Sequence, residues 1–216
     1  MRQNRARSRR NLARQLKLED PAGNGMLSEM LSILEVPTVR RQAASISVET
    51  YHRLGEQGLV AEQTELLRGV IIEKMSKSPL HVSLVRHLML LAEAAAGEEY
   101  VVRKEDPLTL ADSEPEPDLA IVRGDASDFR RRHPTTAVLV IEVAVSSEEI
   151  DREKVAIYAA ANIPECWLVL PARSVVEVFT QPEDGVYRHR LVYSEIGALV
   201  SEQLPALRVD LERLFA

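Results

Sequence analysis

Helical spacing of apolar residues marks three segments of the chain. In the longest, apolar residues at positions 82, 85, 88, 89 and 92 fall on one helix face behind Ser78 and Pro79, which favour a helix start. Gly58 and Gly97 stand where the end of a helix favours a left-handed residue. The pattern therefore predicts helices over residues 47–57, 78–97 and 148–161, and a short terminal helix over residues 210–215.

Segments rich in β-branched and other apolar residues lie between these helices and predict strands. Residues 64–75 (TELLRGVIIEKM) are typical of a hairpin or a bent strand. Residues 137–145 (AVLVIEVAV) are almost wholly apolar, as expected of a central strand buried on both faces, and only Glu142 interrupts them. The sequence therefore predicts an α/β domain, with further strands at residues 99–105, 107–110, 117–122, 165–170, 175–180 and 185–193.

The composition is that of a globular protein in a reducing compartment. Hydrophobic residues make up 45% of the 216 residues, which is enough for the core of one domain with a tail. The single cysteine, Cys166, cannot form an internal disulfide or a zinc cluster, which favours a cytoplasmic location. No apolar run is long enough for a membrane span, and none follows the basic start as in a secretory signal, so we expect no membrane contact.

Charge is distributed unevenly between the start of the chain and the rest. Residues 1–17 hold six Arg and one Lys without an acid, a charge of +7; since the whole chain carries -6, the other 199 residues carry -13. An acidic body disfavours broad adhesion to DNA, so any contact with nucleic acid must be local. We interpret residues 1–45 as a basic tail and linker, partly disordered, and residues 46–216 as the domain. The tail is also compatible with a DNA contact or an organelle-targeting peptide.

Glu142 is the residue that most needs a chemical explanation. A charged carboxylate inside a buried strand costs several kcal/mol unless a cation or a hydrogen-bond donor compensates it. Strand alternation places it on the same face as Val138, Val140 and Ala144, a surface that is otherwise small and apolar. Two interpretations stay open at this point: a metal ligand, or a glutamate near the strand end that pairs with a lysine or arginine.

Asp118 offers a second carboxylate at the start of another apolar strand. It follows Pro117 directly, in the segment PDLAIV. Two carboxylates on neighbouring strands would suit Mg²⁺, which takes one or two protein carboxylates and keeps its other positions for water and phosphate. The alternative is a turn-forming acid after proline, with Glu114 and Glu116 as further, solvated charges.

Lys154 lies on the helix predicted after the Glu142 strand. Asp151, Lys154, Val155 and Tyr158 share one face of that helix, which should pack back over the strand. A lysine in this place can orient an attacking water and offset charge on phosphate oxygens. The alternative is a surface pair between Asp151 and Lys154. Tyr158 itself is interpreted as a core residue.

Asp118 followed by Glu142 on the next long apolar strand resembles the PD-(D/E)XK nuclease superfamily. Ala144 stands where that motif has its lysine. The chain is more specifically similar to the Uma family of endonucleases, in which the lysine comes from the next helix, as Lys154 would here. The resemblance covers Ser47 to Phe215 through segments in the same order: VETYHRLGEQGLV, TELLRGVIIEKMS, SPLHVSLVRHL, EPDLAIV, VLVIEVAVSS and SSEEIDREKVAIYAAANIPECWLVLP.

The resemblance implies a restriction-endonuclease-like mixed β-sheet flanked by helices and a metal-dependent endonuclease that hydrolyses DNA. It implies that Asp118 and Glu142 bind Mg²⁺ or Mn²⁺ and that Lys154 places the attacking water, with a 5′-phosphate and a 3′-hydroxyl as products. It also implies a role near the metal for Glu65 and for His81. The alternatives for these two are a strand-edge acid and a helix-start residue facing solvent.

Three other positions differ from the residues usual in the family motifs. These are Arg68, Ser147 and Leu170, where Asp, Pro and Asp are common. A second hypothesis, supported by Ala144 and the acidic body, is a nuclease-like fold that binds nucleic acid or regulates without cleavage. A third is activity on RNA or an organic phosphate. Apolar strands near the C-terminus are compatible with a homodimer.

Overall fold

A computed structural model describes residues 36–194 and 197–216 of the chain. The chain divides into two units, Met1–Ala44 and Ser45–Ala216. In the first, the described residues form helix α1 (Pro37–Gln42), which begins with a proline at its first position. The predicted basic tail, residues 1–17, lies outside the described residues.

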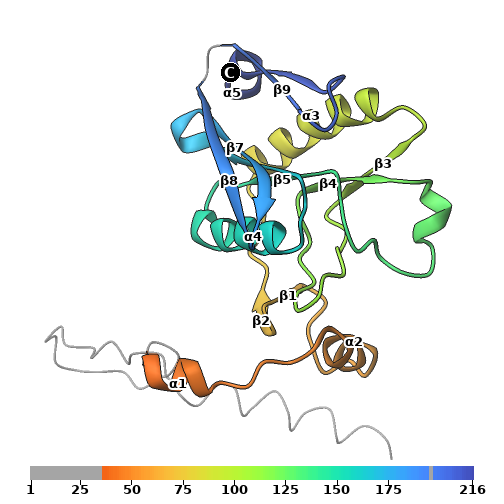
Figure 1. Cartoon of the computed structure of the whole chain (residues 1–216), viewed down its shortest axis with the longest axis vertical. Coiled ribbons are helices and arrows are strands. Elements are labelled where there is room, and N and C mark those ends of the chain that lie inside the picture. Colours follow the sequence, from red (N-terminus) through yellow and green to blue (C-terminus); the bar gives the residue numbers. More distant parts are fainter. Residues whose placement is uncertain (1–35, 195–196) are drawn as a thin grey trace, which may run out of the picture. The chain divides into compact units, whose positions relative to one another are not determined.

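The described part of Ser45–Ala216 contains four α-helices, two 3₁₀ turns and ten strands (Figure 1). The helical elements are α2 (Val48–Glu56), α3 (Pro79–Ala96), η3 (Ala126–Phe129), α4 (Glu148–Ala160), η4 (Pro171–Arg173) and α5 (Leu211–Phe215). The strands are β1 (Thr64–Leu67), β2 (Val70–Glu73), β3 (Tyr100–Lys104), β4 (Leu119–Arg123), β5 (Leu139–Val143), β6 (Glu165–Leu170), β7 (Val175–Glu183), β8 (Val186–Ser194), β9 (Ala198–Val200) and β10 (Arg208–Asp210).

The main sheet follows the order of the chain. Among the described residues it has six strands in the order β3-β4-β5-β6-β7-β8, and β1 with β2 and β9 with β10 form two separate antiparallel pairs. Strands β5 and β6 are parallel, because α4 connects them by a crossover, whereas the other neighbours in the main sheet are antiparallel. This mixed sheet flanked by helices confirms the predicted fold class.

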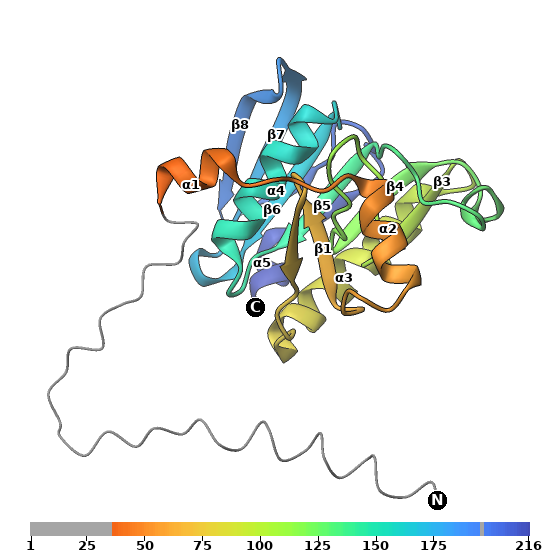
Figure 2. The same ribbon diagram turned by 90° about the horizontal axis from the view of Figure 1, so that it is seen from below.

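The two faces of the main sheet bury different helices. Leu139, Ile141 and Val143 of β5 join the core that contains α3 and α5, while Val140 joins the core under α4. Figure 1 shows α3 and α5 on one side of the sheet and α4 on the other. Figure 2 shows the β1–β2 hairpin beside α4. Because side chains alternate along β5, Glu142 belongs to the α4 side.

Local signals placed the helix starts correctly. The Ser47 side chain accepts a hydrogen bond from the backbone N–H of Thr50, and the Ser78 side chain accepts one from that of His81. One helix-face prediction was wrong: Val82 was assigned to the apolar face of α3, but it is 48% exposed. Val85, Leu88 and Ala92 are buried as predicted, and Leu84, which was not assigned to that face, is buried in place of Val82.

The turn between β1 and β2 depends on a glycine. Arg68 and Gly69 both have a positive φ, 49° and 76°, as a two-residue hairpin turn requires. A Cβ added to Gly69 would lie 2.4 Å from the Cβ of Ser45 and 2.9 Å from the carbonyl oxygen of Ile46. The predicted hairpin is therefore confirmed, and close packing of residues 45–46 explains its glycine.

One predicted strand is not formed, and others differ in length from the prediction. Residues 107–110 form a loop, because the N–H of Leu108 bonds to the carbonyl of Pro115 and that of Leu110 to Ser113, so the segment folds back on itself. The segment 137–145 forms a strand only over Leu139–Val143. Strand β7 continues to Glu183, beyond its predicted end. The pair β9–β10 was not predicted.

Two further features bear on the earlier expectations. Cys166 is a buried free thiol in strand β6. In the part of the chain that the structure describes, no helix is both long and apolar enough to cross a membrane.

Glu177 ties α4 to strands β7 and β8. Its carboxylate accepts hydrogen bonds from Arg152 at 3.0 and 2.8 Å and from Arg190 at 2.9 and 2.8 Å. The hydrogen bonds from Arg152, with those from Arg190, outweigh the effect of burial and lower the pKa of Glu177 to about 2. A carboxylate with a lowered folded-state pKa stabilises the fold above its unfolded pKa, and this contribution disappears as the pH falls through the folded value.

We therefore expect Glu177→Gln to lower the free energy of unfolding by roughly 2 kcal/mol at pH 7. This is less than the pKa shift alone implies, because Arg190 is half exposed and its interaction is screened by water. Urea unfolding between pH 7 and pH 2 should show the difference from the unmodified protein shrinking below pH 4.5. The control Glu183→Gln, in an exposed pair with Arg188, should change stability by less than about 0.5 kcal/mol. A difference that stays constant over this pH range would contradict the assignment.

Candidate active site

Asp118 and Glu142 lie side by side on neighbouring strands. Leu119 of β4 pairs with Ile141 of β5, so the next step of the antiparallel register sets Asp118 opposite Glu142. The backbone N–H of Asp118 donates to Oε2 of Glu142 at 3.3 Å, and the N–H of Val143 donates to Oδ2 of Asp118 at 2.8 Å. Each carboxylate is thus bound to the strand that carries the other, which fixes both orientations.

Glu142 is almost fully buried, at 1% exposure, and its second oxygen has two partners. The hydroxyl of Tyr158 donates to Oε1 at 2.6 Å, and the ammonium nitrogen of Lys154 lies 3.5 Å from the same atom. Burial raises the pKa of Glu142 well above its usual value against the opposing effect of Lys154, and Asp151 and Asp118 raise it further. A carboxylate in this state gains most from an additional positive charge.

Helix α4 brings Lys154 into contact with a residue far away in the chain. The Lys154 ammonium donates to Oε1 of Glu65 at 2.8 Å, and the same oxygen accepts from the backbone N–H of Glu116 at 2.7 Å. Burial alone would lower the pKa of Lys154, but the negative charges of Glu142 and Glu65 outweigh it and raise the pKa above its usual value. Lys154 is therefore a buried cation at neutral pH, and Glu65 is buried beside it.

The alternative of a surface pair between Asp151 and Lys154 was wrong. Both side chains are buried, at 5% and 6% exposure, and the ammonium pairs with Glu65 instead. The Asp151 carboxylate accepts a hydrogen bond from the hydroxyl of Ser147, and burial raises its pKa. Ser147, which stands where the family commonly has a proline, thus supplies a hydroxyl that fixes the Asp151 carboxylate.

His81 also belongs to the site. Its Nε2 lies 2.9 Å from Oδ1 of Asp118, and the residue is buried at 8% exposure, so the interpretation as a solvent-facing helix start was wrong. The N-cap at Ser78 places it in the first turn of α3, directed at Asp118. Its Nδ1 has no hydrogen-bond partner among the described residues.

These residues line one cavity of about 90 Å³. Its walls carry more negative than positive groups, an imbalance that repels a phosphate and attracts a cation. The carboxylates are those of Glu65, Glu73, Glu105, Glu116, Asp118, Glu142 and Asp151, and the lysines are Lys74, Lys77 and Lys154. Ion pairs of Lys74 with Glu116 and of Lys77 with Glu105 take up two of the lysines.

The donor set fits a hydrated divalent cation. In residues 36–194 and 197–216, no three His, Cys, Asp or Glu side chains converge as a metal site made by protein alone would require. Asp118 and Glu142 would therefore share an ion with water molecules, a type of coordination that suits Mg²⁺ and Mn²⁺. The cavity has room for several waters, since one occupies about 30 Å³.

Sequence reasoning missed the role of Tyr158 in this site and the burial of Glu114 near it. Tyr158 is a core residue as predicted, at 0% exposure, and its hydroxyl also holds Glu142. The signal was present, because Tyr158 lies one helical turn after Lys154 on the same face. Glu114 was interpreted as solvated, but it is buried and bonded to His52 at 2.6 Å, whereas Glu116 pairs with Lys74 at the cavity rim.

The fold is similar to that of a solved structure. The structure is similar to a crystal structure described as a "putative nuclease belonging to DUF820" from Anabaena variabilis ATCC 29413, with a TM-score of 0.61 and 17% sequence identity over 75% of this chain and 96% of that chain. The two proteins therefore share a fold, a mixed α/β sheet flanked by helices.

The sequence gives the family within that class. A family model described as "Putative restriction endonuclease" (Uma2) matches residues 48–212, and the chain belongs to this family. The family resemblance stated from the motifs is thus confirmed. No curated protein matches the chain.

Replacing Lys154 should test how much the buried cation stabilises the fold. Lys154→Met leaves Glu65 and Glu142 without their cation, and breaking a buried ion pair on one side typically costs about 3–5 kcal/mol. We expect a loss of that size in urea unfolding at pH 7. The control Lys77→Met removes a partly exposed pair with Glu105 and should cost about 1 kcal/mol or less. Equal losses in the two variants would contradict the proposed burial of the charge.

Proposed function

We propose that the protein is a metal-dependent endonuclease that hydrolyses phosphodiester bonds in DNA. The observation that carries the proposal is the convergence of Asp118, Glu142 and Lys154 on one buried, net negative cavity. Membership of a family described as restriction endonucleases supports the same reaction class.

Asp118 and Glu142 are the proposed metal ligands, for Mg²⁺ or Mn²⁺. When bound, the ion supplies a Lewis acid that lowers the pKa of a coordinated water. His81 and the N–H of Val143 fix the two oxygens of Asp118, and Tyr158 fixes Glu142. Such supporting hydrogen bonds hold ligands in a productive orientation before the substrate arrives.

Lys154 is proposed to act where the family motif usually has a lysine on the strand. Ala144 cannot do so, but the Lys154 nitrogen lies 3.5 Å from Glu142 and so reaches the acid pair from α4. Its ammonium can orient the attacking water and stabilise charge on the phosphate. Glu65 is proposed as the residue that positions Lys154, because it accepts a hydrogen bond from the ammonium.

The products would be a 5′-phosphate and a 3′-hydroxyl, by in-line attack of water on the scissile phosphorus. A cytoplasmic location and a homodimer stay predictions from the sequence. The alternative function, binding without cleavage, was supported by Ala144. The presence of Lys154 beside Glu142 favours the enzyme over that alternative.

Plasmid nicking is the direct test of the proposed activity. Supercoiled plasmid incubated with the protein and Mg²⁺ or Mn²⁺ should give nicked and linear products, and EDTA should abolish them. Asp118→Ala and Lys154→Ala should each lower the rate by about 10²-fold or more, because each removes a group that acts on the reacting phosphate.

The matched control for this assay is Glu73→Gln, which removes an exposed rim acid and should keep most of the activity. If neither Mg²⁺ nor Mn²⁺ supports nicking, or if nicking equals that of the Asp118 and Lys154 variants, the proposed nuclease activity is wrong and the binding alternative stands. The same assay with RNA measures the remaining substrate class.

Metal binding can be measured without turnover. Thermal unfolding in increasing Mg²⁺ or Mn²⁺ should show a rising midpoint, since a ligand at 100 times its Kd stabilises the folded state by about 2.7 kcal/mol. Asp118→Asn should remove most of the rise, whereas Glu73→Gln should keep it. A midpoint that responds equally in all three proteins would place the ion elsewhere.

A further inference from the structure

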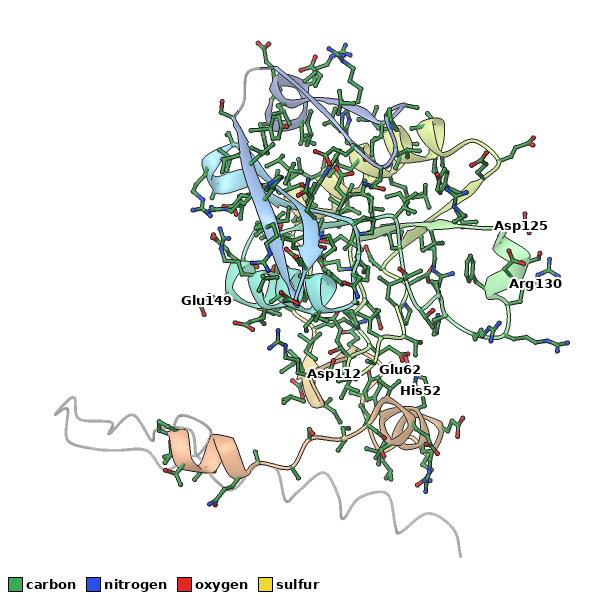
Figure 3. The ribbon with its side chains drawn as sticks, in the orientation of Figure 1. His52, Glu62, Asp112, Asp125, Arg130 and Glu149 are labelled. Carbon is green, nitrogen blue, oxygen red and sulfur yellow. The ribbon has the colours of Figure 1, made fainter. Side chains whose placement is uncertain are left out.

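Three consecutive arginines stand at a distance along the chain from the active-site residues. Arg130, Arg131 and Arg132 follow η3, all three are exposed, and none forms a side-chain hydrogen bond or ion pair with another described residue. Figure 3 shows Arg130 beyond η3, pointing away from the sheet. By contrast, Arg152, Arg188 and Arg190 are engaged with carboxylates.

The segment that carries these arginines is fixed at both ends. At its start, Asp125 and Asp128 form a capping box around η3. At its end, the carbonyl of Pro134 accepts a hydrogen bond from the N–H of Thr109 at 2.9 Å. Groups held in place before a ligand arrives lose less entropy on binding, so the arginines are presented as a prepared surface.

Arg103 of strand β3 holds the middle of the same segment. Its guanidinium lies 5.6 Å from the ring centre of Phe129, and one of its nitrogens lies 3.3 Å from Nδ1 of His133. The three arginines therefore lie between two residues, Phe129 and His133, that both contact the partly buried Arg103.

The arginines line a second cavity, of about 740 Å³, whose opposite wall comes from α2 and from Glu114. The Glu114 carboxylate accepts from His52 at 2.6 Å and from Thr109 at 3.2 Å, so its charge is engaged. Glu56 of α2 and Glu62 of the following loop also line this cavity, so the positive charge lies on the wall of the arginines.

One short stretch of chain connects this cavity to the active site. Glu114 lines the arginine cavity, whereas Glu116 and Asp118 line the active-site cavity. Four residues of extended chain span at most about 14 Å. Since each base pair of duplex DNA rises about 3.4 Å, the Glu114 wall of this cavity lies within about four base pairs of Asp118, and the arginines lie on the wall across from it.

We propose that Arg130, Arg131 and Arg132 bind the sugar–phosphate backbone of duplex DNA outside the active-site cavity. This deepens the proposed function and rests on it. The body of the protein is acidic, so a duplex needs a local cationic surface to be held near a net negative active site. Contacts of this type position a duplex without reading its sequence.

Fluorescence anisotropy with a labelled duplex DNA, in EDTA and at several salt concentrations, tests the proposal on the full chain. In the triple variant Arg130→Gln, Arg131→Gln, Arg132→Gln, we expect the slope of log K against log salt to become shallower by roughly 2.7, about 0.9 for each lost phosphate contact. The dissociation constant at 100 mM salt should rise by about tenfold or more.

Two matched variants control for net charge and for folding. Arg86→Gln, Arg208→Gln, Arg213→Gln removes the same charge from exposed positions on α3, β10 and α5, and should keep the slope. Replacing the three loop arginines by lysines keeps the charge and should restore binding and slope. Binding and slope unchanged in the loop glutamine variant, or lowered equally in the α3, β10 and α5 variant, would overturn the proposal.

The assays separate this proposal from the proposed activity. If the protein nicks no plasmid but its DNA binding depends on the loop arginines, the binding surface stands and the proposed nuclease activity is wrong. If the glutamine variant nicks plasmid at the same rate and binds DNA equally well, the nuclease activity stands and the proposed binding surface is wrong. Tighter, loop-dependent binding of a duplex RNA of the same sequence would overturn the assignment to DNA.

Discussion

The structure around the central sheet has to stabilise one buried carboxylate, that of Glu142. Glu142 is 1% exposed in a strand whose other residues are apolar, and an isolated charge there would cost several kcal/mol. It is compensated from three directions, by the hydroxyl of Tyr158, the ammonium of Lys154 and the N–H of Asp118. The groups that make this burial tolerable are also those that form the candidate active site, so stability and chemistry share the same contacts.

The crossover between β5 and β6 explains why the amine can come from a helix. Parallel neighbouring strands require the chain to return across the sheet, and α4 makes that return on the face where Glu142 points. One turn of α4 then supplies both Lys154 and Tyr158. Ala144, which lies two residues after Glu142 on the same strand face, is buried in the core under α4. In place of a lysine at that strand position, Lys154 reaches the Glu142 carboxylate from helix α4.

Charge is arranged on two scales in this protein. The candidate active-site cavity is net negative and suits a divalent cation, while Arg130, Arg131 and Arg132, which pair with no carboxylate among the described residues, line a second cavity. An acidic body with a local basic surface limits nonspecific adhesion to nucleic acid and still offers a place to hold a duplex. The partly buried His52–Glu114 contact and the contacts of Arg103 with Phe129 and His133 hold the walls around that surface in place.

Local order along the chain was enough to predict the helix starts at Ser47 and Ser78, the β1–β2 hairpin and the anomalous Glu142, because caps, turns and alternation depend on residues a few positions apart. The resemblance to the family also singled out Glu65 and Lys154. Their contact joins residues 89 positions apart, and the loop at residues 107–110 is set by carbonyls of Ser113 and Pro115. Such contacts depend on strand register and on the path of the crossover, which no local pattern contains. The tertiary structure alone therefore decided that Lys154 is a buried cation rather than half of a surface pair, and that the hydroxyl of Tyr158 contacts the acid pair.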